Sequence, residues 1–395
     1  MSPSSSPRLH LFDRTEEGRF ISRRNRFVIE CLVGNAVHPV YLPNPGRLRE
    51  LLLPGRKLYL AENAAGAKFT WTAVAVERDG QPILLHTHMA NRVVEWLLLK
   101  RAIPGFEDAA ILKREVLAGH SRFDFLLQKN GSPFLLEVKS CTLFQGAVAM
   151  FPDAVTDRGR RHLMELAEMA RRGTPAGVVV LIHKPDVRWF LPDYHTDLAF
   201  ARAMSATRNA ISFTALSVAW DTDLSLSPST LTRAVIPWDM LEREACDGGS
   251  YILIIRLNSD RHIEIGGLGV LLFRRGYYLY VGSAQTGMSG RIGRHLRKRR
   301  HVDRHIDYLR NEADGIKALP VRSSEHLECA LVDKLGELSE WSIPGFGCSG
   351  CTCESHLVAV EDDPERDEDF IGLLQYFRIG RLQEMLEGKE IPHPG

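Results

Sequence analysis

The sequence predicts a multidomain protein that combines α/β and α+β folds. Its 395 residues exceed what one ordinary core can hold, so two or three domains are expected. Residues 10–85 are rich in strand-forming residues and punctuated by turn signals, which favours a small β-barrel or sandwich. Helical and strand patterns then alternate over residues 86–240, which is typical of an α/β domain. A Ser-, Thr- and Asp-rich stretch ending at Gly248-Gly249 predicts a linker over residues 241–248.

Composition and charge place broad limits on function. Hydrophobic residues make up 44% and charged residues 25%, as is normal for a globular protein, while the formal net charge is +1. Any nucleic-acid site must therefore arise from local clustering of charge. No apolar run approaches the roughly 20 residues that span a bilayer, so no membrane partner is expected. Residues 1–9 lack an apolar signal core and predict a disordered tail on a cytoplasmic protein.

The first strand-rich region carries one candidate nucleic-acid contact. Between Phe20 and Phe27, arginines alternate with aromatic residues, and Arg23 and Arg26 are the candidate ligands of a phosphate backbone. The alternative interpretation is a basic strand edge without a ligand.

A hairpin in the second domain carries the chief candidate site. Two strand-forming runs flank Asn130-Gly131, which is the strongest short hairpin signal. If these two residues form the turn, Asp124 faces Glu137 and Arg122 faces Lys139, with Cβ atoms about 5 Å apart. Like charges that face each other so closely repel unless a cation lies between them. Because side chains alternate along a strand, Glu137 and Lys139 share one face.

This arrangement suits phosphodiester cleavage. Two carboxylates hold Mg²⁺ or Mn²⁺ with several waters left in place, and the metal acidifies one water and neutralises charge in the transition state. Lys139 would orient the attacking water or stabilise developing negative charge. The spacing from Asp124 to the Glu-x-Lys motif matches the PD-(D/E)XK nuclease pattern, although no proline precedes Asp124. The alternative is a solvated hairpin with a surface ion pair.

Two predicted helices add candidates to this site. Residues 88–101 predict a helix with an apolar stripe, and Glu95 beside that stripe is either a third metal ligand or a surface carboxylate. A second helix from 157 to about 172 places Arg158 and His162 four residues apart, so that both can face a phosphate. An exposed basic face is the alternative.

The last third of the chain contains a dense basic cluster. Residues 291–305 hold seven Arg or Lys and three His against one Asp, which favours contact with a phosphate backbone over a merely solvated face. The candidate contacts are Arg294, His295, Arg297, Lys298, Arg299 and Arg300.

Seven cysteines, three of them in one short loop, indicate reduced thiols rather than a secreted disulfide framework. The loop offers Cys348, Cys351, Cys353 and His356 as four possible ligands of Zn²⁺, with reduced cysteines that pack the loop as the alternative. Residues 361–395 predict an acidic linker followed by a C-terminal helix.

Three stretches resemble the sugar fermentation stimulation protein (SfsA) family. They begin at Pro43-Asn-Pro-Gly46, at Ser121-Arg-Phe-Asp124 and at Phe151-Pro-Asp-Ala154, and the resemblance covers roughly residues 8–240. It implies an OB-like domain over residues 10–85 and a PD-(D/E)XK nuclease-like domain over residues 86–240. It also implies DNA binding and a regulatory role in sugar metabolism.

Residues 249–360 resemble a GIY-YIG-type domain of an uncharacterised class. The resemblance implies that Tyr251 and Tyr280 are the tyrosines that help activate a nucleophile, that Arg291 stabilises charge and that Glu328 holds a metal. Two departures are a Gly-Ser-Tyr first motif and a longer separation between the tyrosine motifs.

The sequence hypothesis is a metal-dependent nuclease that acts on DNA. A regulator that binds DNA without turnover, and an adaptor whose basic helix binds RNA, are the alternatives. Oligomerisation stays open.

Overall fold

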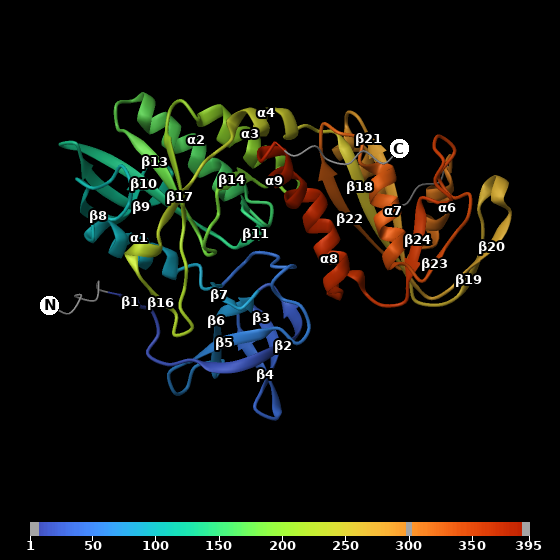
Figure 1. Cartoon of the computed structure of the whole chain (residues 1–395), viewed down its shortest axis with the longest axis horizontal. Helices are drawn as coiled ribbons and strands as arrows, with labels where there is room; N and C mark the ends of the chain where they lie inside the picture. The colour runs from blue at the N-terminus through green and yellow to red at the C-terminus, as the bar shows by residue number, and fades with distance from the viewer. Residues whose placement is uncertain (1–7, 298–301, 389–395) are drawn as a thin grey trace. The chain divides into compact units, whose positions relative to one another are not determined.

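A computed structural model describes residues 8–297 and 302–388, and it divides into two compact units (Figure 1). Unit 1 comprises Met1–Leu241 and unit 2 comprises Glu242–Gly395. The division falls inside helix α4 (Trp238–Glu244), so the predicted linker over 241–248 begins within a helix. Glu244 is fully buried and bonds to Arg381, which explains why this stretch is not a free linker.

Unit 1 begins with a closed β-barrel. Its sheet follows the order β4-β3-β2-β5-β6-β7, and a parallel pairing between Tyr41 and Thr72 joins β4 to β6 and closes the barrel. Alternating apolar residues such as Ile29 and Val40 fill the interior. The strands are β2 (Glu16–Asn25), β3 (Val28–Val33), β4 (Ala36–Tyr41), β5 (Lys57–Glu62), β6 (Trp71–Arg78) and β7 (Gln81–Leu84). The predicted barrel, rather than a sandwich, is confirmed.

The chain enters the fold earlier than expected. Strand β1 (Leu9–His10) pairs with β16 (Ser225–Leu226), and Leu9 is buried in the core of the following α/β part. The predicted tail therefore ends before Leu9, and residues 1–7 lie outside the described residues.

A mixed sheet of order β17-β15-β13-β10-β9-β8 forms the centre of the rest of unit 1. Apolar residues of α1 pack on one face, and those of α2 and α3 pack on the other (Figure 1). Strands β10, β13 and β15 are parallel, and the central strand β13 is a continuous apolar run because both of its faces are covered. The elements are α1 (Met89–Leu99), β8 (Ala110–Ala118), β9 (Ser121–Lys129), β10 (Ser132–Cys141), α2 (Asp157–Arg171), β13 (Ala176–Ile182), α3 (Leu198–Thr207), β15 (Ser212–Ser217), η1 (Pro228–Thr230) and β17 (Thr232–Ala234).

The hairpin register agrees with the prediction over most of its length. The ladder runs from Ser132 opposite Lys129 to Leu136 opposite Phe125, so Asp124 and Glu137 are the next residues on the two strands. The predicted pairing of Arg122 with Lys139 is wrong. The ladder with β9 ends at Leu136, whereas the ladder with β13 on the other side of β10 continues to Cys141, and Lys139 lies opposite Val180 in it.

A small sheet of β11 (Leu143–Gln145), β12 (Val148–Phe151) and β14 (Trp189–Pro192) adjoins the loop that contains Gly46. The Asp153 carboxylate accepts a hydrogen bond from the Leu48 amide at 3.1 Å. A Cβ atom on Gly46 would lie 2.3 Å from Oδ2 of Asp153, so this position requires glycine.

Unit 2 contains an antiparallel sheet of order β22-β18-β21-β24-β23 (Figure 1). Its core includes Leu253, Ile255 and Tyr278. The elements are β18 (Gly249–Leu257), β19 (Arg261–Glu264), η2 (Gly266–Leu268), β20 (Val270–Phe273), β21 (Gly276–Ala284), α5 (Met288–His295), α6 (His305–Glu312), β22 (Gly315–Arg322), α7 (Glu328–Leu338), β23 (Trp341–Ser342) and β24 (Leu357–Val360).

The C-terminal segment is an integral part of unit 2 rather than a linker followed by a helix. It forms η3 (Pro364–Arg366), α8 (Glu368–Gln375), η4 (Tyr376–Gly380) and α9 (Arg381–Leu386). Arg378 donates to the Pro320 carbonyl of β22, and buried Arg381 pairs with Glu244 at 2.6 Å. Within the described residues, no helix is both long enough and apolar enough to cross a bilayer.

Candidate functional site

The ends of β9 and β10 bring the first predicted carboxylate into a fixed position. Asp124 is largely buried, and its Oδ1 accepts a hydrogen bond from the Asn91 side chain at 2.6 Å. Its Oδ2 accepts from the Val138 amide at 2.7 Å, which continues the hairpin contact where the regular ladder stops. These two donors orient the Asp124 carboxylate.

The second carboxylate, Glu137, lies on the face of β10 that α2 covers. Its Oε1 accepts from Lys139 Nζ at 2.5 Å and from Nδ1 of His162 at 2.6 Å. Nε2 of His162 accepts from Arg158 at 3.3 Å, so the proton on Nδ1 points to Glu137. Oε2 of Glu137 is buried and has no hydrogen-bond partner among residues 8–297 and 302–388. Of the four carboxylate oxygens of Asp124 and Glu137, it is the one without a hydrogen-bond partner in the part of the chain that the structure describes.

The two carboxyl groups differ in how readily they ionise. Burial, and then the nearby charge of Glu137, raise the pKa of Asp124 to about 6. Burial also disfavours the charged form of Glu137, but Lys139 and His162 outweigh this and hold its pKa below the usual value. The environment of this pair therefore favours one ionised carboxylate and resists the second, which is the condition that a bound cation relieves.

Two predicted members of this site, and one residue that was not predicted, have surroundings that sequence alone did not indicate. Glu95 is held by Arg114 of β8, so its carboxylate pairs with an arginine instead of joining Asp124. His162 is buried, 2% exposed, because it packs against Glu137 rather than facing solvent. Asn91 was missed, although it precedes Glu95 by one helical turn and is the residue of α1 that reaches Asp124.

The two arginines predicted to contact nucleic acid in the barrel differ in exposure. Arg23 directs its guanidinium to the backbone carbonyls of Arg47, Arg26 and Asn44, and burial lowers its pKa. It therefore fixes the loop around Gly46. Arg26 is exposed and lies 5.8 Å from the ring of Phe27, which is itself 43% exposed.

In unit 2, strands β18 and β21 bring the two predicted tyrosine motifs together. Tyr251 lies opposite Gly282, and a Cβ atom there would come within 2.5 Å of the Tyr251 hydroxyl. That hydroxyl is 3.0 Å from Nε2 of His295 on α5, and the Tyr280 ring lies 6.5 Å from the same imidazole. The sequence analysis placed His295 among the candidate nucleic-acid contacts, and the structure buries it beside both tyrosines.

Ser283 connects the other two residues predicted for this site. Its carbonyl accepts from Arg291, and its hydroxyl donates to Oε2 of Glu328 at 2.5 Å. Burial resists ionisation of Glu328, but hydrogen bonds from His356 and Ser283 hold its pKa below the usual value. Burial lowers the pKa of His295 to about 4 and raises that of Tyr280 to about 12. The imidazole is therefore neutral at pH 7 and the phenol is protonated.

The basic cluster lies partly within the described residues. Arg294 and Arg297 are exposed, and a cavity of about 110 Å³ is lined by Arg291, Arg294, His295, Asp303, Arg304 and Asp307. The predicted contacts Lys298, Arg299 and Arg300 lie outside the described residues.

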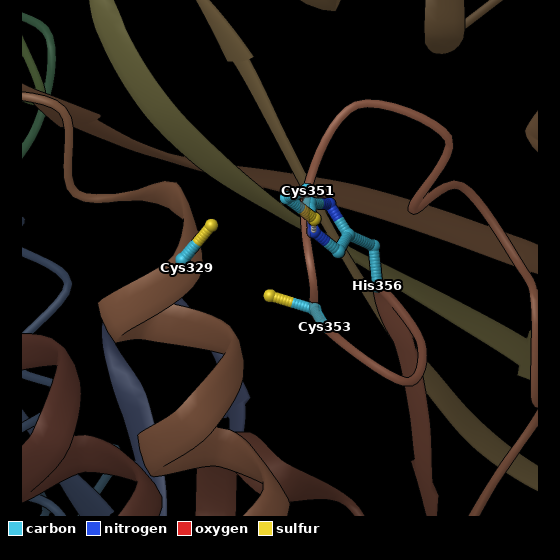
Figure 2. A group of neighbouring side chains, drawn as sticks. All are labelled: Cys329, Cys351, Cys353 and His356. Atoms are coloured by element: carbon cyan, nitrogen blue, oxygen red, sulfur yellow. Dashed lines mark hydrogen bonds between the residues drawn. The ribbon is translucent and has the colours of Figure 1, made fainter. Parts of the chain in front are cut away.

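The predicted zinc ligand set needs correction. Cys329, Cys351, Cys353 and His356 form a group whose ligand atoms all lie within 4.8 Å of one another (Figure 2). Cys348 is not part of it, because its thiol faces the Glu354 carbonyl at 3.5 Å. The replacement, Cys329, comes from α7, so its proximity depends on packing between distant segments.

Comparison with family models divides the chain in three. The family model described as "SfsA N-terminal OB domain" matches residues 21–85, and the model described as "Sugar fermentation stimulation protein RE domain" matches residues 88–223. A "Domain of unknown function DUF123" matches residues 250–378, which lie in unit 2.

Individual relatives agree with this division. A sugar fermentation stimulation protein homolog of Clostridium tetani is 36% identical over 197 residues, which is 49% of this chain and 86% of that protein. The homolog of Methanothermobacter thermautotrophicus is 34% identical over 226 residues, 56% of this chain and 93% of that protein. A structure described as Pyrococcus furiosus SfsA in complex with Ca²⁺ is similar at a TM-score of 0.53 and 27% identity, and covers 58% of this chain and 99% of that one. On this similarity, the chain belongs to the sugar fermentation stimulation protein (SfsA) family and carries a C-terminal DUF123 domain.

Proposed function

We propose that unit 1 is a metal-dependent nuclease that acts on DNA, with Asp124 and Glu137 as ligands of Mg²⁺ or Mn²⁺ in a PD-(D/E)XK-like fold. The observation that carries the proposal is the buried, unpartnered Oε2 of Glu137 beside an Asp124 whose pKa is raised to about 6. Carboxylate oxygens are ligands of hard divalent cations, and the Pyrococcus furiosus relative is described as a complex with Ca²⁺, a cation of the same kind.

The neighbouring residues fit supporting roles in this chemistry. When bound, the ion supplies Lewis acidity and a water of lowered pKa. Asn91 and the Val138 amide hold Asp124, while His162 holds Glu137 from behind and leaves Oε2 open. Lys139, whose amine contacts Glu137, would orient the attacking water and stabilise charge on the phosphate. Arg158 contacts His162 and would bind the adjacent phosphate.

DNA as the partner is supported by chemistry in the barrel. OB folds use exposed aromatic rings and cations to bind nucleic-acid strands, and Phe27 with Arg26 presents that combination. The alternative, a DNA-binding regulator without turnover, shares this surface and differs only in the outcome at the metal site.

We further propose a second phosphodiester site in unit 2, in the manner of GIY-YIG nucleases. It is favoured by the contact between the Tyr251 hydroxyl and His295, because a neutral imidazole accepts a hydrogen bond from the phenol and fixes the orientation of its hydroxyl. Tyr280 adjoins them, Arg291 would stabilise the anionic transition state, and Glu328 would hold a metal. Exposed Arg294 and Arg297 would contact the phosphate backbone.

One assay separates these proposals. Labelled single- and double-stranded DNA and RNA are incubated with the full chain and Mg²⁺ or Mn²⁺, and then with a chelator. Asp124→Asn and Glu328→Gln remove the two sites separately, and Glu168→Gln, a half-buried carboxylate of α2 that pairs with Arg171 and Arg172, is the matched control. We expect metal-dependent DNA cleavage that Asp124→Asn abolishes. Cleavage that persists in Asp124→Asn but not in Glu328→Gln would assign the activity to unit 2. Tight DNA binding without cleavage under either metal would establish the regulator instead.

A further inference from the structure

A group of soft ligands in unit 2 adjoins the proposed tyrosine site, where Glu328 contacts His356, but consists of other residues. Cys351, Cys353 and His356 come from the loop between β23 and β24, and Cys329 comes from the first turn of α7. Figure 2 shows the thiols of Cys329 and Cys353 directed toward each other across the gap between helix and loop, with Cys351 and His356 beside them. Three thiols and an imidazole therefore converge from two separate segments.

We propose that Cys329, Cys351, Cys353 and His356 bind one Zn²⁺ ion that fastens this loop to α7. Three cysteines and one histidine are an established ligand combination for tetrahedral zinc, and four protein ligands leave no open position for a substrate. The site is therefore structural rather than catalytic. The proposal does not depend on nuclease activity in either unit.

The spacing of the ligand atoms fits this ion. Sulfur atoms about 2.3 Å from a tetrahedral zinc lie about 3.8 Å from one another. The ligand atoms here lie within 4.8 Å of one another, so side-chain shifts of about 1 Å would complete the coordination. The loop ligands follow a Cys-x-Cys-x-x-His spacing, and a fourth ligand from α7 removes the crowding of a site built from the loop alone.

His356 is already oriented as a ligand. Its ring is buried, and Nε2 lies 3.1 Å from the thiol of Cys351. On the other side of the ring, Nδ1 lies 3.2 Å from Oε1 of Glu328. A carboxylate behind a metal-binding histidine fixes its tautomer and increases its basicity. Glu328 is thus a positioning residue for His356, in addition to its contact with Ser283.

The loop also contacts the tyrosine site, which gives the ion a structural purpose. The ring of Phe346 lies 6.1 Å from that of Tyr280, and a Cβ atom on Gly347 would lie 3.0 Å from the same tyrosine. Zinc bound at the far end of this loop would hold these residues against Tyr280. The expected consequence of zinc loss is increased mobility around Tyr280.

The first experiment measures zinc in the full chain by elemental analysis after purification with zinc and gel filtration. We expect about one zinc ion per chain for the wild type. Cys329→Ser should lose it, and Cys348→Ser, a cysteine of the same loop outside the group, should retain it. Retention in Cys329→Ser with loss in Cys348→Ser would overturn the ligand assignment, and a metal-free wild type would overturn the site.

A second measurement avoids the risk that a cysteine variant misfolds. Wild-type protein is alkylated with and without zinc, and each cysteine is mapped by mass spectrometry. We expect zinc to protect Cys329, Cys351 and Cys353, while labelling of Cys348 stays unchanged. Cobalt substitution should add thiolate-to-metal absorption typical of a tetrahedral site. Equal labelling of all four cysteines with zinc present, or a disulfide in the non-reduced protein, would refute the proposal.

Discussion

Each unit contains a contact between Nδ1 of a histidine and Oε1 of a glutamate. The two contacts differ in which partner has an atom that faces further ligands. In unit 1, Nδ1 of His162 contacts Oε1 of Glu137 at 2.6 Å, and the carboxylate carries the open atom. In unit 2, Nδ1 of His356 lies 3.2 Å from Oε1 of Glu328, and the imidazole faces the thiol of Cys351. The first arrangement presents oxygen, which suits a hard cation such as Mg²⁺, and the second presents nitrogen among sulfurs, which suits Zn²⁺.

This difference teaches that a His–Glu contact does not define a site by itself. What decides its chemistry is which partner faces the remaining ligands. Asp124 and the unpartnered Oε2 of Glu137 offer oxygen ligands of the kind that the proposed hydrolytic metal requires. The three thiols around His356 complete a closed site.

The largest expected effect is on catalysis in unit 1. Asp124→Asn removes the negative charge that binds the metal, so metal-dependent DNA cleavage should fall by about a thousandfold. Cleavage rates with Mn²⁺ at saturating DNA measure this. Zinc content in unit 2 should remain at the wild-type value. Loss of both DNA cleavage and bound zinc would show that the variant disturbs folding instead.

Zinc removal should produce the next largest effect, confined to unit 2. If zinc is present at about a thousand times its dissociation constant, it stabilises the folded state by about 4 kcal/mol. Thermal unfolding of chelated and zinc-loaded protein measures this difference. In Cys329→Ser the two curves should coincide, whereas Cys348→Ser should respond like the wild type.

The raised pKa of Asp124 predicts a pH dependence in the metal-free protein. A carboxyl group whose pKa rises from 3.8 to about 6 on folding is most favourable when protonated, so its contribution is present below pH 4 and is lost as pH rises through 6. Asp124→Asn cannot ionise. Its carbonyl can still accept from the Val138 amide, and its NH₂ group can donate to Asn91 once the Asn91 amide turns to present its oxygen. Near pH 8 it should be more stable than wild type by up to about 3 kcal/mol.

Denaturant titrations at pH 4 and pH 8 without divalent ions test this expectation. Added Mg²⁺ should reduce the stability difference between Asp124→Asn and the wild type at pH 8, because it stabilises the wild type alone. The affinity of the wild type for Mg²⁺ should weaken as pH falls below about 6. An equal difference in unfolding free energy between the variant and the wild type at both pH values would contradict the raised pKa of Asp124.

The smallest expected effects come from the residues behind the ligands. His162→Gln should weaken Mg²⁺ binding in unit 1 by about tenfold, and Glu328→Gln should weaken Zn²⁺ binding in unit 2 by about the same factor. Competition titrations with metal-sensitive dyes measure both affinities. His162→Gln should leave the Zn²⁺ affinity unchanged, and Glu328→Gln should leave the Mg²⁺ affinity unchanged. A change in either of these would show that the two His–Glu contacts do not act independently.

The sequence was most informative where the site is local. The Asn130-Gly131 turn predicted the register that carries Asp124 beside Glu137, because two-residue hairpins fix pairing over the next several residues. Alternation along β10 correctly placed Lys139 beside Glu137. The predicted register failed at Arg122, since the ladder between β9 and β10 ends at Leu136 while β10 continues only beside β13, and no local signal announces where the ladder ends.

Residues recruited from elsewhere in the chain escaped prediction. Asn91 and Cys329 belong to helices that approach their sites only through packing of apolar faces. His162 and Arg23 were assigned to nucleic acid because cations in a pattern suggest exposure. Burial against Glu137 and against backbone carbonyls gives them positioning roles instead.

By itself, the sequence determined the barrel, the hairpin with its two carboxylates, the opposed tyrosine strands and membership of the SfsA family. These features depend on turns, alternation and contiguous motifs, which are short-range properties of the chain. The tertiary structure alone decided which atom of each His–Glu pair is open and which cysteine completes the metal group. Those outcomes depend on how helices pack on sheets, which brings together residues far apart in sequence and sets their burial.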